Sequence, residues 1–193
     1  MKVGLYFGSF NPVHYGHLAI AGFLKEQAFF DQIWFVVSPN NPLKNQQELI
    51  PEHHRLNMVK TAIQDMPALH ACDVEFALPK PSYTINTLHF LEKEYPNYEF
   101  SLILGADNII SFHKWKDYEI IMERYKIYVY PRKGDTCENL IQHPHIVYVD
   151  APLLPISATE VRGLLKQKKS TIGYLPDSVI RYIEKNKIVK SDG

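Results

Sequence analysis

Short apolar runs alternate with segments of helical length and composition along the whole chain. The runs predicted as strands are 2–8, 32–39, 71–76, 99–106, 126–132 and 145–151. The segments predicted as helices are 17–30, 51–66, 84–94, 118–125, 157–168 and 176–187. This alternation is typical of a mainly parallel sheet with helices on both faces. We find no repeat or linker, so residues 1–193 are expected to form one doubly wound α/β domain.

The composition excludes several functions. The 193 residues carry 21 basic and 21 acidic side chains, so no basic footprint for nucleic acid or for an anionic membrane surface is expected. No run approaches the ~18 apolar residues of a membrane span, and the polar residues after Lys2 argue against a cleaved signal peptide. Cys72 and Cys137 belong to no paired-cysteine motif, which favours free thiols and a cytoplasmic location over a disulfide.

Ligands of doubly wound sheets bind beyond the carboxyl ends of the strands. At the carboxyl end of the first predicted strand, Gly8 is followed by a turn and then by His14 and His17. A glycine lets the backbone approach a ligand closely, and a spacing of three puts both imidazoles on nearly one face of a helix start, where an anion is favoured. There are two alternatives to anion binding. The histidines could have only a structural role, as helix caps or packed side chains, or they could bind zinc.

A second place lies near the end of the chain, in PISATEVRGLL (155–165). Ser157 is the expected N-cap, with Glu160 as its capping-box partner. Thr159 and Arg162 would then lie on the exposed first turns, where a hydroxyl and a guanidinium can bind an anion. The capping role and the anion-binding role are compatible.

The third place is LGADNIISFHKWKDY (104–118), in which Gly105 ends a strand. Asp107 could cap the next helix or accept hydrogen bonds from a ligand hydroxyl. Trp115 lies among polar residues, so a partly exposed stacking role competes with a role in the core.

These stretches together resemble a known family. GSFNPVHYGH (8–17) resembles the G-x-F-[DN]-P-x-H-x-G-H signature of the nucleotidyltransferase superfamily, and ISATEVR (156–162) resembles its I-S-x-T-x-x-R partner. SYTINTL (82–88) and GADNIISFHKW (105–115) resemble segments of the bacterial nicotinate-nucleotide adenylyltransferases. The resemblance runs from Lys2 to the final helix and implies a Rossmann-like nucleotidyltransferase fold.

The resemblance implies that AMP passes from ATP to nicotinate mononucleotide, which gives deamido-NAD and pyrophosphate. It also implies magnesium bound mainly to phosphates and water, with no protein metal site. The implied catalytic residues are His14, His17, Lys44 and Arg162. The implied ATP-binding residues are Gly8, Ser9, Phe10, His14, His17, Gly105, Asp107, Arg132, Ser157, Thr159 and Arg162. The implied substrate-binding residues are Asn11, Lys44, Tyr83, Thr84 and Trp115.

The sequence departs from the family at four positions: Asn11 and Asn86 stand where aspartate is common, Leu43 replaces a histidine before Lys44, and Ala158 replaces a second serine. Two alternatives stay open. One is another adenylyltransferase of the same fold, such as the pantetheine-phosphate enzyme, and the other is a nucleotide-binding regulator without turnover. Homo-oligomerisation is also left open.

Overall fold

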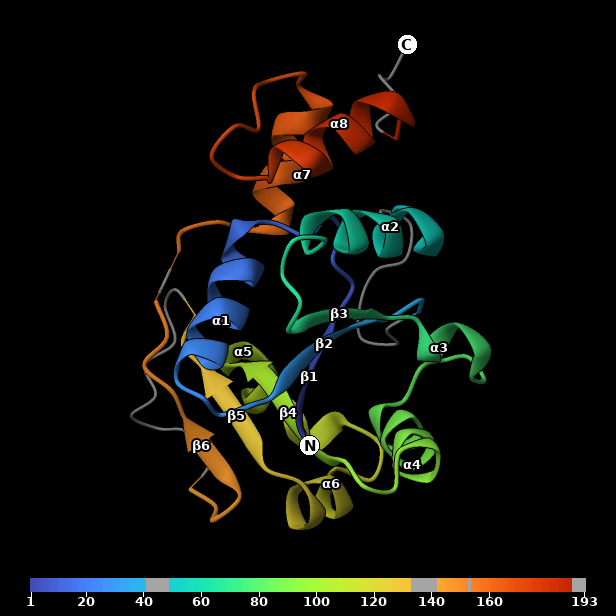
Figure 1. Ribbon diagram of the computed structural model, residues 1–193, viewed down its shortest axis with the longest axis vertical. Coiled ribbons are helices and arrows are strands. Elements are labelled where there is room, and N and C mark those ends of the chain that lie inside the picture. The colour runs from blue at the N-terminus through green and yellow to red at the C-terminus, as the bar shows by residue number, and fades with distance from the viewer. Residues whose placement is uncertain (41–48, 133–141, 153, 189–193) are drawn as a thin grey trace.

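Six parallel strands form one sheet in the order β3-β2-β1-β4-β5-β6 in the computed structural model (Figure 1), which describes residues 1–40, 49–132, 142–152 and 154–188. The strands are β1 (Lys2–Gly8), β2 (Gln32–Val37), β3 (Leu69–Cys72), β4 (Glu99–Gly105), β5 (Ile127–Tyr130) and β6 (Ile146–Tyr148). The order reverses between β1 and β4, which pair in parallel from Lys2↔Glu99 to Tyr6↔Ile103. The expected doubly wound fold is confirmed, and the reversal marks where a ligand of such a sheet binds.

Helices cover both faces of this sheet. The longer ones are α1 (Tyr15–Glu26), α2 (Glu52–Ala62), α4 (Thr84–Glu94), α7 (Ala158–Lys166) and α8 (Asp177–Lys185), and the shorter ones are α3 (Val74–Ala77), α5 (Ala106–Ile110), the 3₁₀ helix η1 (Phe112–Lys114) and α6 (Tyr118–Arg124). Of these described helices, none has the length and apolar character needed to cross a membrane.

Two apolar clusters occupy the two faces because successive strand residues point to opposite sides. In β4, Leu102 and Leu104 pack with α4, α5 and α6, whereas Ile103 packs with α1, α2 and α8. All three are almost fully buried. The sheet is therefore a rigid platform whose strand ends carry the site.

Some predicted boundaries are wrong. The helix expected over 17–30 ends at Glu26, because Ala28 adopts a left-handed φ of 55° that turns the chain back toward the sheet. There Asp31 N–H donates to the Lys2 carbonyl at 2.8 Å. The freed Phe30 packs against Tyr128 instead, with ring centroids 4.8 Å apart.

The strand expected over 71–76 is also misplaced. β3 covers Leu69–Cys72, and the chain then forms the short helix α3. This turn puts the side chain of Glu75 into the interior, where it is 1 % exposed. Similarly, Pro51 is the N-cap of α2 rather than a residue of its first turn, and α2 ends at Ala62.

Candidate active site

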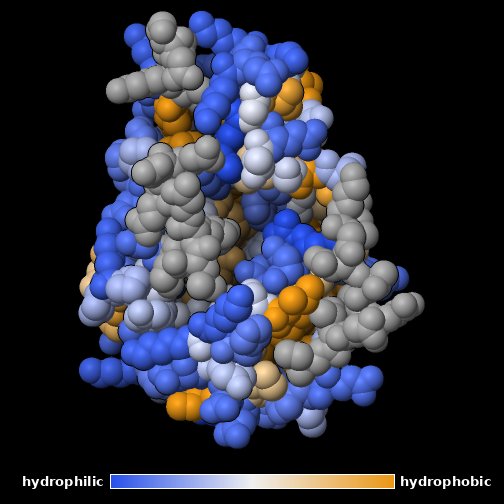
Figure 2. Space-filling model, turned by 180° about the vertical axis from the view of Figure 1, so that it is seen from behind, coloured by the Kyte–Doolittle hydropathy of each residue, from blue (hydrophilic) through white to orange (hydrophobic). Residues whose placement is uncertain are grey.

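The predicted site residues gather in one cavity of about 680 Å³ at the carboxyl ends of the strands. Figure 2 shows hydrophilic side chains around a hollow near the middle of the face opposite to that of Figure 1. Every predicted site residue within the described part of the chain lines the cavity; these are Gly8, Ser9, Phe10, Asn11, His14, His17, Tyr83, Thr84, Gly105, Asp107, Trp115, Arg132, Ser157, Thr159 and Arg162. Lys44 and Leu43 lie outside the described residues.

The turn after β1 folds back over its own glycine. Phe10 adopts a left-handed φ of 45°, and its ring lies 2.8 Å from the point where Gly8 would carry a Cβ. The ring of Phe10 thus occupies the space that a side chain at residue 8 would need, while the backbone of Gly8 still lines the cavity. The glycine permits the turn, and the turn carries the chain to His14.

The two histidines form a stacked pair at the start of α1. His14 is the N-cap, and its backbone N–H donates to Nδ1 of His17 at 3.2 Å. The ring centroids lie 3.7 Å apart with an interplanar angle of 30°. The expectation that both imidazoles share one face of a helix start is thus confirmed.

Their environments differ. His14 is 3 % exposed, and burial together with the nearby charge of Arg132 lowers its pKa to about 4. Its Nδ1 is buried without a hydrogen-bond partner among the described residues. His14 is therefore neutral at physiological pH in the free protein, where it can donate one N–H but carries no charge.

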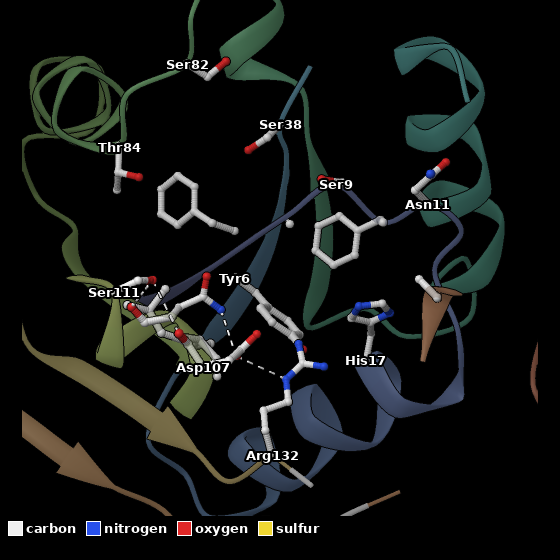
Figure 3. A pocket seen from close by; sticks show the side chains of 18 of the residues that line it. Tyr6, Ser9, Asn11, His17, Ser38, Ser82, Thr84, Asp107, Ser111 and Arg132 are labelled. Carbon is white, nitrogen blue, oxygen red and sulfur yellow. Dashed lines mark hydrogen bonds and ion pairs between the residues drawn. The ribbon is translucent and has the colours of Figure 1, made fainter. Parts of the chain in front are cut away.

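A chain of polar side chains lies beside this pair; Figure 3 shows Tyr6 next to His17, with Asp107 and Arg132 lower in the view. Tyr6 donates to the hydroxyl of Tyr130 at 3.1 Å, and Arg132 donates to the same oxygen at 3.1 Å. Burial raises the pKa of both tyrosines, so their hydroxyls stay protonated. The ring of Tyr6 lies edge-on to that of His17, with centroids 6.0 Å apart.

Asp107 lies at the end of this chain, on the first turn of α5. It is not the helix cap that we considered, because Gly105 is the N-cap. Its carboxylate is 3.5 Å from Nε of Arg132 and half exposed, so it remains available to ligand hydroxyls. A Cβ on Gly105 would lie 2.5 Å from the Asp107 carboxylate and 2.8 Å from Arg132, so the glycine leaves room for this ion pair in its present position.

The helix α7 brings the late motif to the opposite wall of the cavity. Ser157 is its N-cap as predicted, and its hydroxyl accepts the N–H of Glu160 at 3.1 Å. The Glu160 carboxylate accepts the hydroxyl of Tyr174 at 3.3 Å. Arg162 donates to the Asn11 carbonyl at 3.1 Å and to Thr159 at 3.3 Å, so it joins α7 to the turn after β1.

The other end of the cavity is aromatic. Trp115 follows η1 and packs on Phe112, with centroids 5.2 Å apart, while one part of the indole remains exposed. Tyr83 is the N-cap of α4, and the ammonium group of Lys116 lies 5.0 Å from the centre of its ring. Lys114 lines the same cavity, so sequence reasoning missed two cationic side chains at this end.

Arg55 is a further residue that the sequence did not single out. It is 1 % exposed on α2, and its guanidinium donates to four carbonyls: Ile50 at 2.8 Å, Ser9 at 2.6 Å, Ser38 at 2.8 Å and Pro39 at 3.2 Å. Burial lowers its pKa to about 10, which still leaves it charged at neutral pH. Arg55 therefore ties the turn after β1 to the end of β2.

A second cavity of about 390 Å³ meets the first. The residues that line both are Tyr6, His14, His17, Asp107, Tyr130, Arg132 and Ser157. Two ligands, or two halves of one ligand, could thus meet beside the histidine pair. Among the described residues, no three His, Cys, Asp or Glu side chains are grouped to hold a metal ion.

The fold and this site define a nucleotidyltransferase, and the comparisons agree. The model of the cytidylyltransferase-like family matches residues 5–164. The chain is 49% identical over 192 residues to a Flavobacterium johnsoniae protein named "Probable nicotinate-nucleotide adenylyltransferase", which covers 98% of this chain and all of the relative. A Bacteroides fragilis protein of the same name is 43% identical over 94% of this chain and 90% of its own length.

The chain therefore belongs to the nicotinate-nucleotide adenylyltransferases of this family. Solved structures share its fold. The Plasmodium falciparum nicotinic acid mononucleotide adenylyltransferase complexed with NaAD has a TM-score of 0.76 at 21% identity, with 96% of both chains covered. The same enzyme complexed with APC has a TM-score of 0.74 at 20% identity.

Proposed function

We propose that this protein, as a single domain over residues 1–193, transfers AMP from ATP to nicotinate mononucleotide at the cavity described above. A phosphate oxygen of the mononucleotide attacks the α-phosphorus of ATP, the bond to the β-phosphate oxygen breaks, and pyrophosphate leaves. The products are deamido-NAD and pyrophosphate. The observation that carries the proposal is the stacked pair His14 and His17 at the place where the two cavities meet.

The two cavities suit the two halves of the product. Trp115 and the first turn of α4 offer an aromatic wall and backbone donors for the pyridine ring and its carboxylate. Asp107 and Arg132 line the region that both cavities share, next to the half of the site proposed for ATP. The half-exposed carboxylate of Asp107 suits the hydroxyls of the ATP ribose. Ser157, Thr159 and Arg162 would hold the phosphates that leave.

The chemistry needs no protein nucleophile, because the substrate phosphate attacks directly. Catalysis then rests on positioning and on donors aimed at the charge that develops at the α-phosphate. His17, at the third position of α1, would donate to this group, and His14 would assist as a neutral donor. Phosphates bound beside His14 favour its protonation.

Magnesium fits this site as the ATP complex. Since the described residues form no carboxylate cage, phosphate oxygens and water would hold the ion, as is usual for magnesium. When bound, it neutralises charge on the phosphates. The substrates, together with the free thiol of Cys72, favour a cytoplasmic location.

A substrate panel tests the proposal. Purified protein is incubated with ATP, magnesium and one phosphomonoester, and pyrophosphate release is measured. We expect release with nicotinate mononucleotide and none when magnesium is chelated. Activity only on 4′-phosphopantetheine would assign the other adenylyltransferase function. ATP binding without turnover on any acceptor would instead assign a regulator.

A further inference from the structure

Glu75 is a buried acidic side chain on the wall of the larger cavity, and the proposed reaction leaves it without a role. It lies on α3, between β3 and the segment that leads to α4, and it is 1 % exposed. It lines the cavity together with Ser38, Ser82 and Thr84. Figure 3 shows these three side chains on the same side of the pocket, away from His17. Glu75 thus belongs to the end of the site that faces the pyridine ring.

One oxygen of Glu75 is bound and the other is not. Thr87, itself 1 % exposed, donates its hydroxyl to Oε1 at 2.9 Å. Oε2 is buried without a hydrogen-bond partner among the described residues, and so is the hydroxyl of Ser82. An unpartnered buried polar group costs free energy unless a ligand or another group satisfies it.

The charge state of Glu75 follows from its surroundings. Burial raises its pKa, and the hydrogen bond from Thr87 opposes this only in part. The titratable groups next to Glu75 in the same chain segment are Cys72 and Asp73. The neighbouring elements that pack against Glu75 present hydroxyl groups to its carboxyl. Of the described lysines and arginines, none contributes to the shift, although Lys114 and Lys116 line the same cavity.

The bond to Thr87 connects Glu75 to the first turn of α4. In that turn the N–H groups of Asn86 and Thr87 both donate to the Tyr83 carbonyl, at 3.0 and 3.4 Å. The N–H groups before them point toward the start of the helix, where negative charge is favoured. Any movement of this turn would therefore displace the N–H groups that a substrate carboxylate would accept from.

We propose that Glu75 is a positioning residue for the acid end of nicotinate mononucleotide: through its buried hydrogen bond to Thr87 it holds the first turn of α4 in place beside the substrate carboxylate. This inference rests on the proposed function. It makes Glu75 a determinant of the KM for the mononucleotide, whereas the KM for ATP, which binds beyond the histidine pair, should not depend on it.

Two substitutions separate this role from a structural one. Glu75→Gln keeps the acceptor for Thr87, so we expect a KM for nicotinate mononucleotide within about 3-fold of the wild type. Glu75→Leu keeps the volume but leaves Thr87 without an acceptor, so we expect this KM to rise about 10-fold, with kcat and the KM for ATP nearly unchanged. A glutamine variant as impaired as the leucine variant, or an unimpaired leucine variant, overturns the inference.

If Glu75→Leu does not fold, Thr87→Val must raise the same KM while Thr87→Ser preserves it, and equal values in both variants overturn the inference.

Failure of the proposed function would look different. A wild-type protein that releases no pyrophosphate with nicotinate mononucleotide would overturn both proposals. A wild-type protein that is active on this substrate, with Glu75→Leu unchanged, would overturn only the inference about Glu75.

Discussion

The imidazoles of His14 and His17 stack 3.7 Å apart on the first turn of α1, and the N–H of His14 donates to the ring of His17. Each ring thereby fixes the other. Tyr6 supports His17 from the sheet, so its remaining ring nitrogen can be aimed without reorganisation. Donors held in place before the reaction are the main source of catalytic power where charge develops on a phosphoryl group.

Replacing His17 should therefore reduce turnover. We expect His17→Ala to lower kcat by roughly 10²- to 10³-fold, the usual effect of losing one preorganised donor, with a smaller change in ATP binding. Steady-state kinetics and ATP titration measure the two effects. His17→Asn is the matched control, because its side-chain oxygen can still accept the N–H of His14. Near-normal turnover in His17→Ala would reject the role of His17.

Arg162 is expected to bind the leaving phosphates. Arg162→Ala should raise the KM for ATP about 10-fold, and should weaken pyrophosphate binding in the reverse reaction, because a charge-assisted hydrogen-bond donor is lost. Arg162→Lys should recover part of the effect, since it keeps the charge but not the planar fork. An unchanged KM for ATP in Arg162→Ala would contradict this role.

Controls must separate binding from folding, because Arg162 also donates to Asn11 and Thr159. Arg181→Ala removes an exposed arginine from α8 and should leave both KM values unchanged. Thermal unfolding should accompany the kinetics. Ser157→Ala should lower the free energy of unfolding by about 1 kcal/mol through loss of the α7 N-cap, which provides a scale for changes in stability alone.

The buried position of His14 predicts a pH-dependent stability. Its pKa is about 4 in the folded protein and near 6.5 when unfolded, so between these values the unfolded chain binds a proton that the folded chain does not. The free energy of unfolding should fall by about 2 kcal/mol from this group between about pH 7 and about pH 5. Urea unfolding at both pH values measures the loss.

His14→Asn isolates this contribution. Asparagine is a good N-cap, so the helix start is preserved while the titrating group is removed. Glu75 acts in the opposite direction, because its raised pKa favours the folded state at low pH, and it is present in both proteins. If the variant and the wild type lose equal stability on acidification, His14 is not the cause.

The sequence predicted the β-α alternation and the places after β1 and β4 because both depend on local patterns: apolar runs, glycines at strand ends and histidine spacing. It did not predict Arg55, because the four carbonyls that it binds come from three separate places in the chain. Glu75 was missed for a related reason. Its stretch alternates like a strand, and only the packing of α4 explains why the chain turns there and buries a carboxyl group.

The last prediction is that nicotinate mononucleotide is preferred over nicotinamide mononucleotide. A pocket that offers backbone N–H groups at the start of α4 and the cations Lys114 and Lys116 suits a carboxylate. The neutral amide gains no charge-assisted bond from these groups, and its NH₂ would face the donors from which a carboxylate accepts. We expect kcat/KM to differ by about 10⁴, the scale seen when a buried polar group is left unpaired. Trp115→Ala should lower kcat/KM for the acid by weakening stacking on the pyridine ring, and Trp115→Phe should recover part of it. The measurement compares kcat/KM for the two mononucleotides in each protein. Equal values in the wild type would show a dual-specificity enzyme and contradict the prediction.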